Sequence, residues 1–168
     1  GPAHVGKLTL AMQVAQAVNC TPPEAAPCGE CEACTRIAAG LHADVRIIAV
    51  DPVEEKLGRA LEMGATHVVA SAARDPVAAV AEITGGAMAD LVVEAVGITQ
   101  TLNLVPALAR RNGQAICFGV PNKDHREGLL SIKMLDMLRQ ELRLTFSVGP
   151  NPDRDYRPAL DWIVQGRI

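Results

Sequence analysis

The chain has 168 residues, of which 49% are hydrophobic, 21% charged and only 2% aromatic, and its formal net charge is −3. This composition favours a soluble globular fold over a disordered or fibrous chain, and the charge disfavours direct nucleic-acid contact. No apolar run reaches the roughly 20 residues that span a bilayer, and no secretion signal is present, so we expect a cytoplasmic protein without a membrane partner. Because the chain starts at a glycine within a motif, we expect a longer parent protein.

The first motif lies at the start of the chain, where residues 1–7 read Gly-Pro-Ala-His-Val-Gly-Lys. Gly1, Gly6 and Lys7 have the spacing of a phosphate-binding P-loop, and a helix is predicted to follow over residues 8–18. Leu8 stands where the hydroxyl of Ser or Thr would hold Mg²⁺, which disfavours nucleotide hydrolysis. The alternative is an ordinary helix start that binds no phosphate.

The second motif contains four of the five cysteines: Cys20, Cys28, Cys31 and Cys34 lie within fifteen residues of one another. Four soft ligands at this spacing predict a closed, structural zinc site, and free reduced thiols are the alternative. A short helix is predicted over residues 32–39, ended by Gly40. The fifth cysteine, Cys117, falls within a predicted buried strand and is interpreted as a core residue.

After residue 44 the pattern changes to short β-branched runs that alternate with helical stretches. The predicted strands are 45–50, 67–70, 91–96, 115–120 and 142–148. The predicted helices are 54–63, 76–83, 100–110, 129–140 and one from about residue 155 to the end. Strands that alternate with helices in this way predict an α/β fold, a Rossmann-like parallel sheet with helices on both faces.

Three positions in this region point to a dinucleotide. Asp51 directly follows the first predicted strand, where a carboxylate can accept hydrogen bonds from the adenosine ribose and disfavour the 2′-phosphate of NADP. Capping of the next helix explains the same residue, with Asp51 as N-cap followed by Pro52. Two further strands end in glycine-bearing pairs, Val96 with Gly97 and Gly119 with Val120, which can face a cofactor or form ordinary turns.

Residues 45–168 resemble the cofactor domain of the medium-chain zinc-dependent alcohol dehydrogenases. The resemblance rests on IIAVDP at 47–52, MGATHVV at 63–69, ADLVVEAVG at 89–97, RNG at 111–113 and FGVP at 118–121. It implies hydride transfer with NAD, with Asp51 as the acid that selects NAD, and with the backbone around Val96 and Val120 near the nicotinamide.

Residues 1–44 resemble a different family, the bacterial DNA polymerase III clamp loader and especially its delta-prime subunit. The resemblance rests on GKLTLA at 6–11, NC at 19–20, PCGECEAC at 27–34 and IAAGLHADV at 37–45. It implies a P-loop, often degenerate, followed by a four-cysteine zinc module. The chain therefore reads as a junction of two families, natural or engineered, with a P-loop and zinc segment over 1–44 and an incomplete dinucleotide-binding domain over 45–168.

The resulting expectation is a dehydrogenase cofactor domain that is inactive alone and has no catalytic residues of its own. The alternative is a nucleotide-binding or structural module of the clamp loader. The expected ligand is a dinucleotide or nucleotide, and self-association is left open. Since the first strand and its glycine-rich loop are missing from the pattern, we expect residues 45–50 to pair directly with 91–96, or only partial order. We therefore also expect NAD affinity to be weak, in the millimolar range or lost (an order-of-magnitude estimate).

Overall fold

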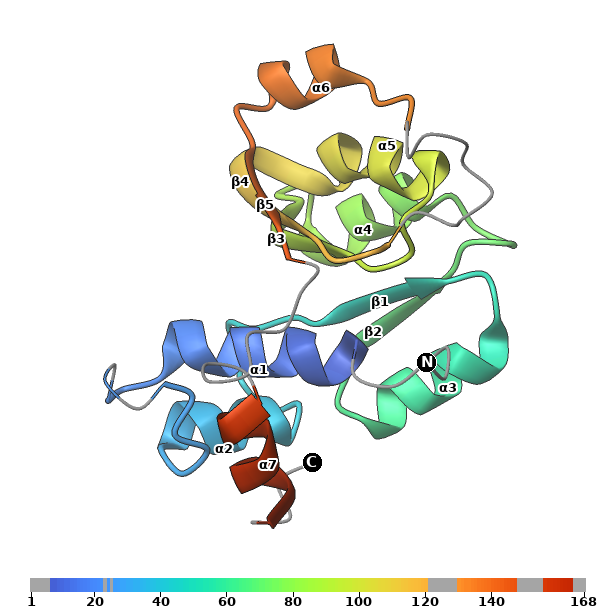
Figure 1. The fold of residues 1–168 in the computed structure, drawn as a ribbon. Coiled ribbons are helices and arrows are strands. Elements are labelled where there is room, and N and C mark those ends of the chain that lie inside the picture. Colours follow the sequence, from blue (N-terminus) through green and yellow to red (C-terminus); the bar gives the residue numbers. More distant parts are fainter. Residues whose placement is uncertain (1–6, 23, 25, 121–129, 148–155, 165–168) are drawn as a thin grey trace. The chain divides into compact units, whose positions relative to one another are not determined.

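The computed structural model describes residues 7–22, 24, 26–120, 130–147 and 156–164 (Figure 1). By its internal contacts the chain divides into two compact units, residues 1–89 and 90–168, here called unit 1 and unit 2. This division lies elsewhere than the family junction predicted near residue 44. None of the described helices is long and apolar enough to cross a membrane.

Unit 1 places two helices before a small parallel sheet. Strands β1 (Ile48–Asp51) and β2 (His67–Ala70) pair in parallel, with Ile48 opposite His67 and Asp51 opposite Ala70. The other elements of unit 1 are helices: α1 (Lys7–Asn19), α2 (Glu32–Ala38), α3 (Glu54–Glu62) and α4 (Pro76–Thr84). The parallel strands with an intervening helix confirm the predicted alternation in this part of the chain.

The core of unit 1 joins residues from both sides of the predicted family junction. Met12 of α1 and Ile37 of α2 are buried in one cluster with Ile47, Ala60 and Ala65, which come from the segments around β1 and α3. Ile37 is only 1% exposed. Apolar side chains buried together stabilise all the elements that contribute them. Helices α1 and α2 are therefore part of the same core as the strand that carries Asp51.

Unit 2 holds a three-stranded sheet in the order β3–β4–β5, formed by β3 (Ala89–Glu94), β4 (Ala109–Cys117) and β5 (Arg143–Phe146). Strands β4 and β5 are parallel, with Gln114 opposite Arg143. Helices α5 (Thr99–Leu108), α6 (Met134–Arg139) and α7 (Arg157–Val164) complete the described elements. The buried side chains of Leu102, Val105, Ala109, Ala115 and Met137 come from α5, β4 and α6.

The predicted α/β, Rossmann-like class is confirmed, and every predicted element has a counterpart, but several bounds differ. Helix α6 begins at Met134 rather than near residue 129. The cause is visible in Asn103 of α5, which accepts from the amide of Lys133 at 2.8 Å and donates to the carbonyl of Ser131 at 3.0 Å. These two bonds tie Ser131 and Lys133 to α5, just before α6 begins.

Strand β1 pairs with β2 and strand β3 pairs with β4, in two sheets that belong to different units. Direct pairing of residues 45–50 with 91–96 would join the two units, so it stays a prediction, as does the alternative of partial order.

Candidate functional site

The four-cysteine cluster, Cys20, Cys28, Cys31 and Cys34, comes together between the end of α1 and the start of α2. The four sulfur atoms all lie within 4.8 Å of one another, and all four residues are free thiols. Four sulfur ligands about 2.3 Å from a tetrahedral ion lie at comparable mutual distances. The donor set and its spacing therefore fit zinc.

Backbone amides surround these sulfurs. The amides of Glu30 and Cys31 donate to the sulfur of Cys28 at 3.4 and 3.3 Å, and the amide of Cys28 donates to the sulfur of Cys20 at 3.4 Å. The amides of Thr21 and Cys34 lower the pKa of the Cys31 thiol to about 6. A thiol that ionises near neutral pH is prepared for metal binding, because the thiolate is the ligand.

Cys34 occupies the buried side of the cluster, where burial raises the pKa of its thiol to about 12. Its carbonyl accepts a hydrogen bond of 2.8 Å from the side-chain amide of Gln16, and its sulfur lies 3.8 Å from the carbonyl of Gln16. Gln16 is itself only 5% exposed. Helix α1 thus fixes one side of the cluster through a buried polar contact that sequence reasoning missed.

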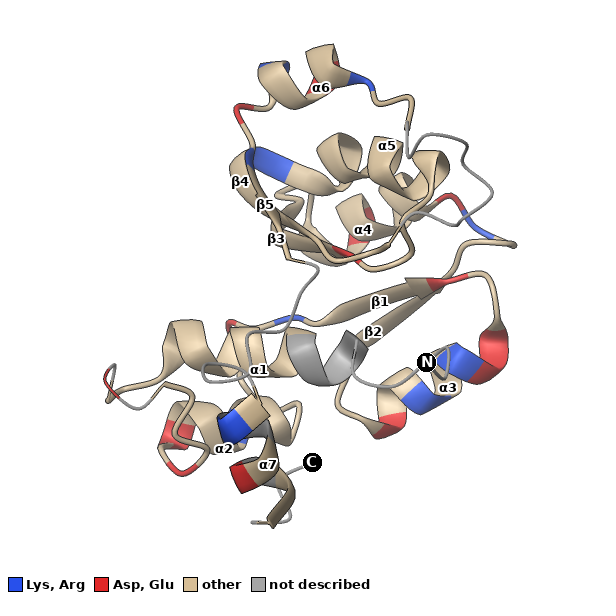
Figure 2. Cartoon of the chain, in the orientation of Figure 1, with Lys and Arg blue, Asp and Glu red and all other residues tan. Residues whose placement is uncertain are grey.

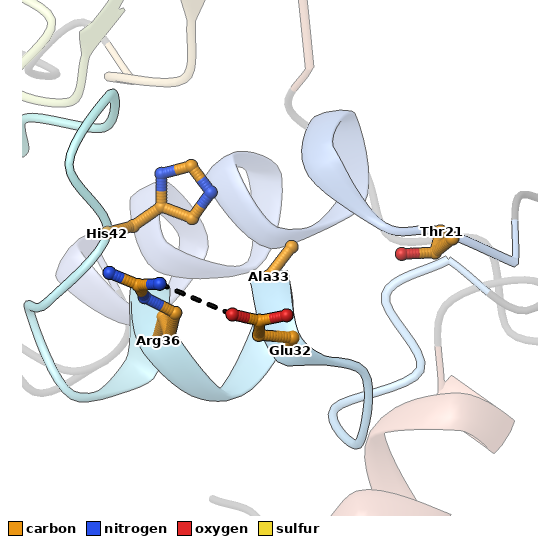
Figure 3. A pocket seen from close by; sticks show the side chains of 5 residues that line it. All are labelled: Thr21, Glu32, Ala33, Arg36 and His42. Carbon is orange, nitrogen blue, oxygen red and sulfur yellow. Dashed lines mark hydrogen bonds and ion pairs between the residues drawn. The ribbon is translucent and has the colours of Figure 1, made fainter.

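A shallow pocket lies beside the cluster, lined by Thr21, Glu32, Ala33, Arg36 and His42 (Figure 3). The guanidinium of Arg36 lies 3.3 Å from the carboxylate of Glu32 and also donates to the carbonyl of Leu41. The positive charge in this pocket is therefore already paired within α2. Nothing in this arrangement indicates a second ligand site.

Asp51 ends β1 shortly before α3, a helix with acidic residues at both ends and basic residues between them (Figure 2). One carboxylate oxygen accepts from the amide of Val53 at 2.9 Å, and the other lies 3.7 Å from the ammonium of Lys56. The N-cap of α3 is Val53, so the interpretation of Asp51 as the N-cap is wrong. Because Asp51 bonds two residues on in a turn before the helix, only its second oxygen is free of the turn; that oxygen faces Lys56, and the Asp51 side chain is 30% exposed.

The structure brings Val96, Gly97, Gly119 and Val120 together, as the paired turns after β3 and β4. A Cβ atom on Gly97 would lie 2.6 Å from the backbone of Val120, and one on Gly119 would lie 2.1 Å from the amide nitrogen of Gly97. The backbones can approach this closely only because both residues are glycine. Val96 and Val120 are 52% and 62% exposed, so their apolar side chains flank the contact on the surface.

A buried carboxylate, Glu94, lies under the paired turns and was not singled out in the sequence. It ends β3, and its carboxylate accepts from the amides of Val96 and Gly97 and from the hydroxyl of Thr101. Nearby, Cys117 is buried, and burial first and the Glu94 charge second raise the pKa of its thiol. This agrees with a core role for Cys117 and disfavours a nucleophilic one.

The predicted phosphate-binding residues Gly1 and Gly6 lie outside the described residues, and Lys7 is described only as the first backbone position of α1. The structure therefore leaves the P-loop interpretation as a prediction. The metal and cofactor residues, in contrast, fall within described segments of unit 1 and unit 2.

Residues 33–165 match the family described as zinc-binding dehydrogenase. The chain belongs to this family. Among curated relatives, the NDMA-dependent alcohol dehydrogenase of Amycolatopsis methanolica is 34% identical over 128 residues. That alignment covers 73% of this chain and 33% of the relative, so the chain spans about a third of its length. The zinc-binding dehydrogenase match begins inside the cysteine segment, at a position earlier than residue 45.

A solved alcohol dehydrogenase of Thermus sp. ATN1 is similar in fold, with a TM-score of 0.64 and 27% identity over 81% of this chain and 37% of that one. A second kind of relative is the DNA polymerase III subunit delta′ of Pseudomonas aeruginosa, 41% identical over 58 residues, which are 34% of this chain and 18% of the relative. The dehydrogenase likeness is thus long and supported by the fold, and the clamp-loader likeness is short.

Proposed function

We propose that the chain is the NAD-binding domain of an oxidoreductase of the zinc-dependent alcohol or polyol dehydrogenase type. The observation that carries the proposal is the contact of the paired turns at the carboxyl ends of β3 and β4, in a chain of the zinc-binding dehydrogenase family. Ligands of open parallel sheets bind outside these strand ends. When bound, NAD would supply the acceptor for a hydride from an alcohol carbon.

Asp51 is the proposed partner of the adenosine ribose. Its carboxylate ends a parallel strand, is half-buried, and has one oxygen committed to the turn and the other facing Lys56. Such a group can accept from the ribose hydroxyls and repel the 2′-phosphate of NADP. The residues present therefore fit NAD, and NADP binding should be weaker.

The four-cysteine cluster is the proposed zinc site, with a structural role. All four positions of a tetrahedral ion would be taken by Cys20, Cys28, Cys31 and Cys34, which leaves no position for a substrate. We also propose that these 168 residues alone do not turn over an alcohol, because a catalytic zinc needs an open position. This zinc should therefore stabilise the fold of the chain and take no part in hydride transfer.

The second candidate is a nucleotide-binding or structural module of the clamp-loader type, joined to dehydrogenase sequence. The 58-residue likeness to the delta′ subunit favours it, together with a cysteine spacing in which the long interval precedes the three close cysteines. In this function the ligand would be ATP or another nucleotide held near Gly1, Gly6 and Lys7, and the metal would again be structural.

Calorimetric titration of the full chain with NAD, NADP and ATP separates the two proposals. We expect NAD to bind weakly, with a dissociation constant in the millimolar range as an order of magnitude, and more tightly than NADP. Asp51→Asn should reduce NAD affinity, while Asp44→Asn, which changes an exposed aspartate of the same unit, should not. Binding of ATP without NAD would contradict the dehydrogenase proposal and support the clamp-loader one.

Turnover provides an independent test. Incubation with NAD and a range of secondary alcohols should produce no NADH above the level of a chain denatured beforehand. Alcohol-dependent NADH formation that follows the protein through a further purification step would show that the 168 residues hold a complete active site.

A further inference from the structure

Helix α2 begins on two residues of the four-cysteine cluster. Cys31 is its N-cap, and the sulfur of Cys31 accepts from the amide of Cys34 at 3.5 Å. Cys34 lies in the first turn and is fully buried. With seven residues, α2 is much shorter than the roughly 12 to 15 residues that a helix needs to be stable alone. The order of α2 therefore depends on what holds its two ends.

The second end of α2 lies in the core of unit 1. Ile37 follows Cys34 by three positions, on the same face of the helix, and is buried with Ile47. The carbonyl of Ala38 lies 3.4 Å from the position that a Cβ atom would take on Gly64, in the turn that follows α3. Helix α2 thus connects the four-cysteine cluster to the segments around β1 and α3.

Ile47 is the residue through which this core reaches the strands. Its amide donates to the hydroxyl of Thr66 at 2.9 Å, and its carbonyl accepts from the amides of Thr66 and His67 at 2.9 and 3.2 Å. These bonds lie at the start of both strands, where Ile48 pairs with His67. A sheet of two strands is marginal alone, and none of the four residues of β1 is buried. The position of β1 therefore depends on the helices packed against it.

The same core supports the groups proposed for the adenosine ribose. Asp51 lies four residues after Ile47, at the end of β1. Lys56, whose ammonium lies 3.7 Å from the Asp51 carboxylate, precedes the buried Ala60 by one turn of α3. A displacement of α2 should therefore move the carboxylate and the ammonium together.

We propose that the four-cysteine cluster is a metal-dependent switch for dinucleotide binding: when its thiolates hold zinc, α2 is ordered, and its core contacts fix Asp51 and Lys56 for the adenosine ribose. Without the metal, α2 loses the restraint at its start and the core loosens. The ligand must then order these groups itself, and it binds more weakly. This inference rests on the proposed NAD-binding function and zinc site.

The first test compares ligand affinity with and without the metal. ADP-ribose, which carries the adenosine ribose but no nicotinamide, is titrated into the zinc-loaded full chain and into the chelated chain, and the amide signals of Asp51 and Val53 are followed by NMR. We expect roughly tenfold lower affinity after chelation, and recovery when zinc is added back. Asp51→Asn should bind weakly in both states.

Two outcomes of this titration separate the switch from the function on which it rests. Equal affinity of the wild-type chain with and without zinc would overturn the switch and leave the NAD-binding function intact. Absence of binding to the zinc-loaded chain would refute the NAD-binding function, and the switch with it.

A pair of core variants tests the path through α2 while the metal stays bound, so it also decides the question if the chelated chain unfolds. Ile37→Val removes one methylene where α2 meets Ile47. It should keep about one zinc per molecule and bind ADP-ribose roughly two- to threefold more weakly than the wild-type chain. Unchanged affinity in this variant would overturn the inference.

Val80→Ala in α4 is the matched control. Val80 is buried in unit 1 but lies outside the core cluster of Ile37 and Ile47, and the substitution removes more of the side chain than Ile37→Val does. Its affinity for ADP-ribose should equal that of the wild-type chain. Equal weakening in the two variants would mean that ligand affinity follows general stability, and would overturn the path through α2.

The reverse measurement uses zinc as the ligand. Binding at two coupled sites is reciprocal, so ADP-ribose near saturation should tighten zinc binding by the same roughly tenfold factor, measured by competition with a zinc-binding dye. Nicotinamide mononucleotide, which has a phosphate but no adenosine, should leave the zinc affinity unchanged. Zinc affinity that is the same with ADP-ribose and with nicotinamide mononucleotide would overturn the switch.

Discussion

Among the residues that the structure describes, each unit buries one polar anchor, and the two anchors differ in what they connect. In unit 1 the buried side-chain amide of Gln16 joins helix α1 to Cys34 in the first turn of α2. In unit 2 the buried carboxylate of Glu94 holds the turn after β3 by accepting from the amides of Val96 and Gly97. The first anchor ties the core to a candidate metal ligand, whereas the second bonds two turn amides and the Thr101 hydroxyl within its own unit. Unit 1 should therefore depend on a metal for its stability, and unit 2 should not.

Metal removal should have the largest effect and should separate the units. Structural zinc contributes on the order of 10 kcal/mol to small zinc domains, so chelation should destabilise unit 1 by several kcal/mol. Because Ile37 and Ile47 are buried in one core, this loss of stability should extend to β1 and β2. We expect amide exchange at Val69 in β2 to accelerate strongly, and exchange at Ala115 in β4 to change little.

Elemental analysis provides the control for this experiment. The purified chain should hold about one zinc per molecule, and Cys31→Ser should lower this content and reproduce the exchange pattern of the chelated protein. A chain without bound metal, or with Val69 equally protected before and after chelation, would contradict the metal dependence of unit 1.

The next largest effect tests whether the two family segments of unit 1 form one core. Ile37→Ala in α2 should cost about 2 to 5 kcal/mol, as for other buried Ile truncations, and should expose the amides of β1 and β2 as well as those of α2. Val105→Ala, at a residue equally buried in unit 2, is the matched control and should leave β1 and β2 protected. If Ile37→Ala reduced amide protection in α2 but not in β1 and β2, the two family segments of unit 1 would fold separately.

Gly97→Ala tests the contact between the paired turns. Gly97 has φ of +82°, which costs an alanine about 1 to 2 kcal/mol, and the added Cβ would lie 2.6 Å from the Val120 backbone. Overpacking should add about 1 to 3 kcal/mol. Gly86→Ala carries the same kind of strain at φ of +86° with no atom within 4 Å of its Cβ, so chemical denaturation should show a smaller loss there. Equal losses in the two variants would indicate that the turns separate easily.

The fold class and the metal ligands could be predicted because they follow from local patterns. Alternating β-branched and helical runs determine the strands and helices, and β2 matches its predicted bounds. Four cysteines within fifteen residues are necessarily close in space, and their four sulfur atoms do come together. The closeness of Val96 and Gly97 to Gly119 and Val120 could also be predicted from the sequence, because each pair follows a strand of the predicted parallel sheet.

Other features depend on contacts between distant residues and carry no local signal. Asn103 shortens α6 through bonds to residues 28 and 30 positions away. Gln16 acts on a residue 18 positions along the chain, and a glutamine within a helical pattern looks like an ordinary exposed residue. Glu94 lies within the run ADLVVEAVG at 89–97, which was interpreted only as dehydrogenase-like sequence, so its buried position was not predicted. A carboxylate that ends an otherwise apolar strand is the signal that could have identified it.

The smallest predicted effect concerns an exposed charge pair in unit 2. The Arg111 guanidinium, 2.5 Å from the carboxylate, lowers the pKa of Glu141 below its ordinary value of 4.5. Since the folded pKa is the lower one, the pair stabilises unit 2 above pH 4.5, and this stabilisation is lost as the pH falls through the folded value. Because both groups are exposed, the effect is small. Thermal unfolding followed at β4 should show a slightly lower midpoint for Glu141→Gln than for wild type at pH 7, and this difference should shrink as the pH is lowered. A difference that persists at the lower pH would mean that Glu141 acts through packing and not through its charge.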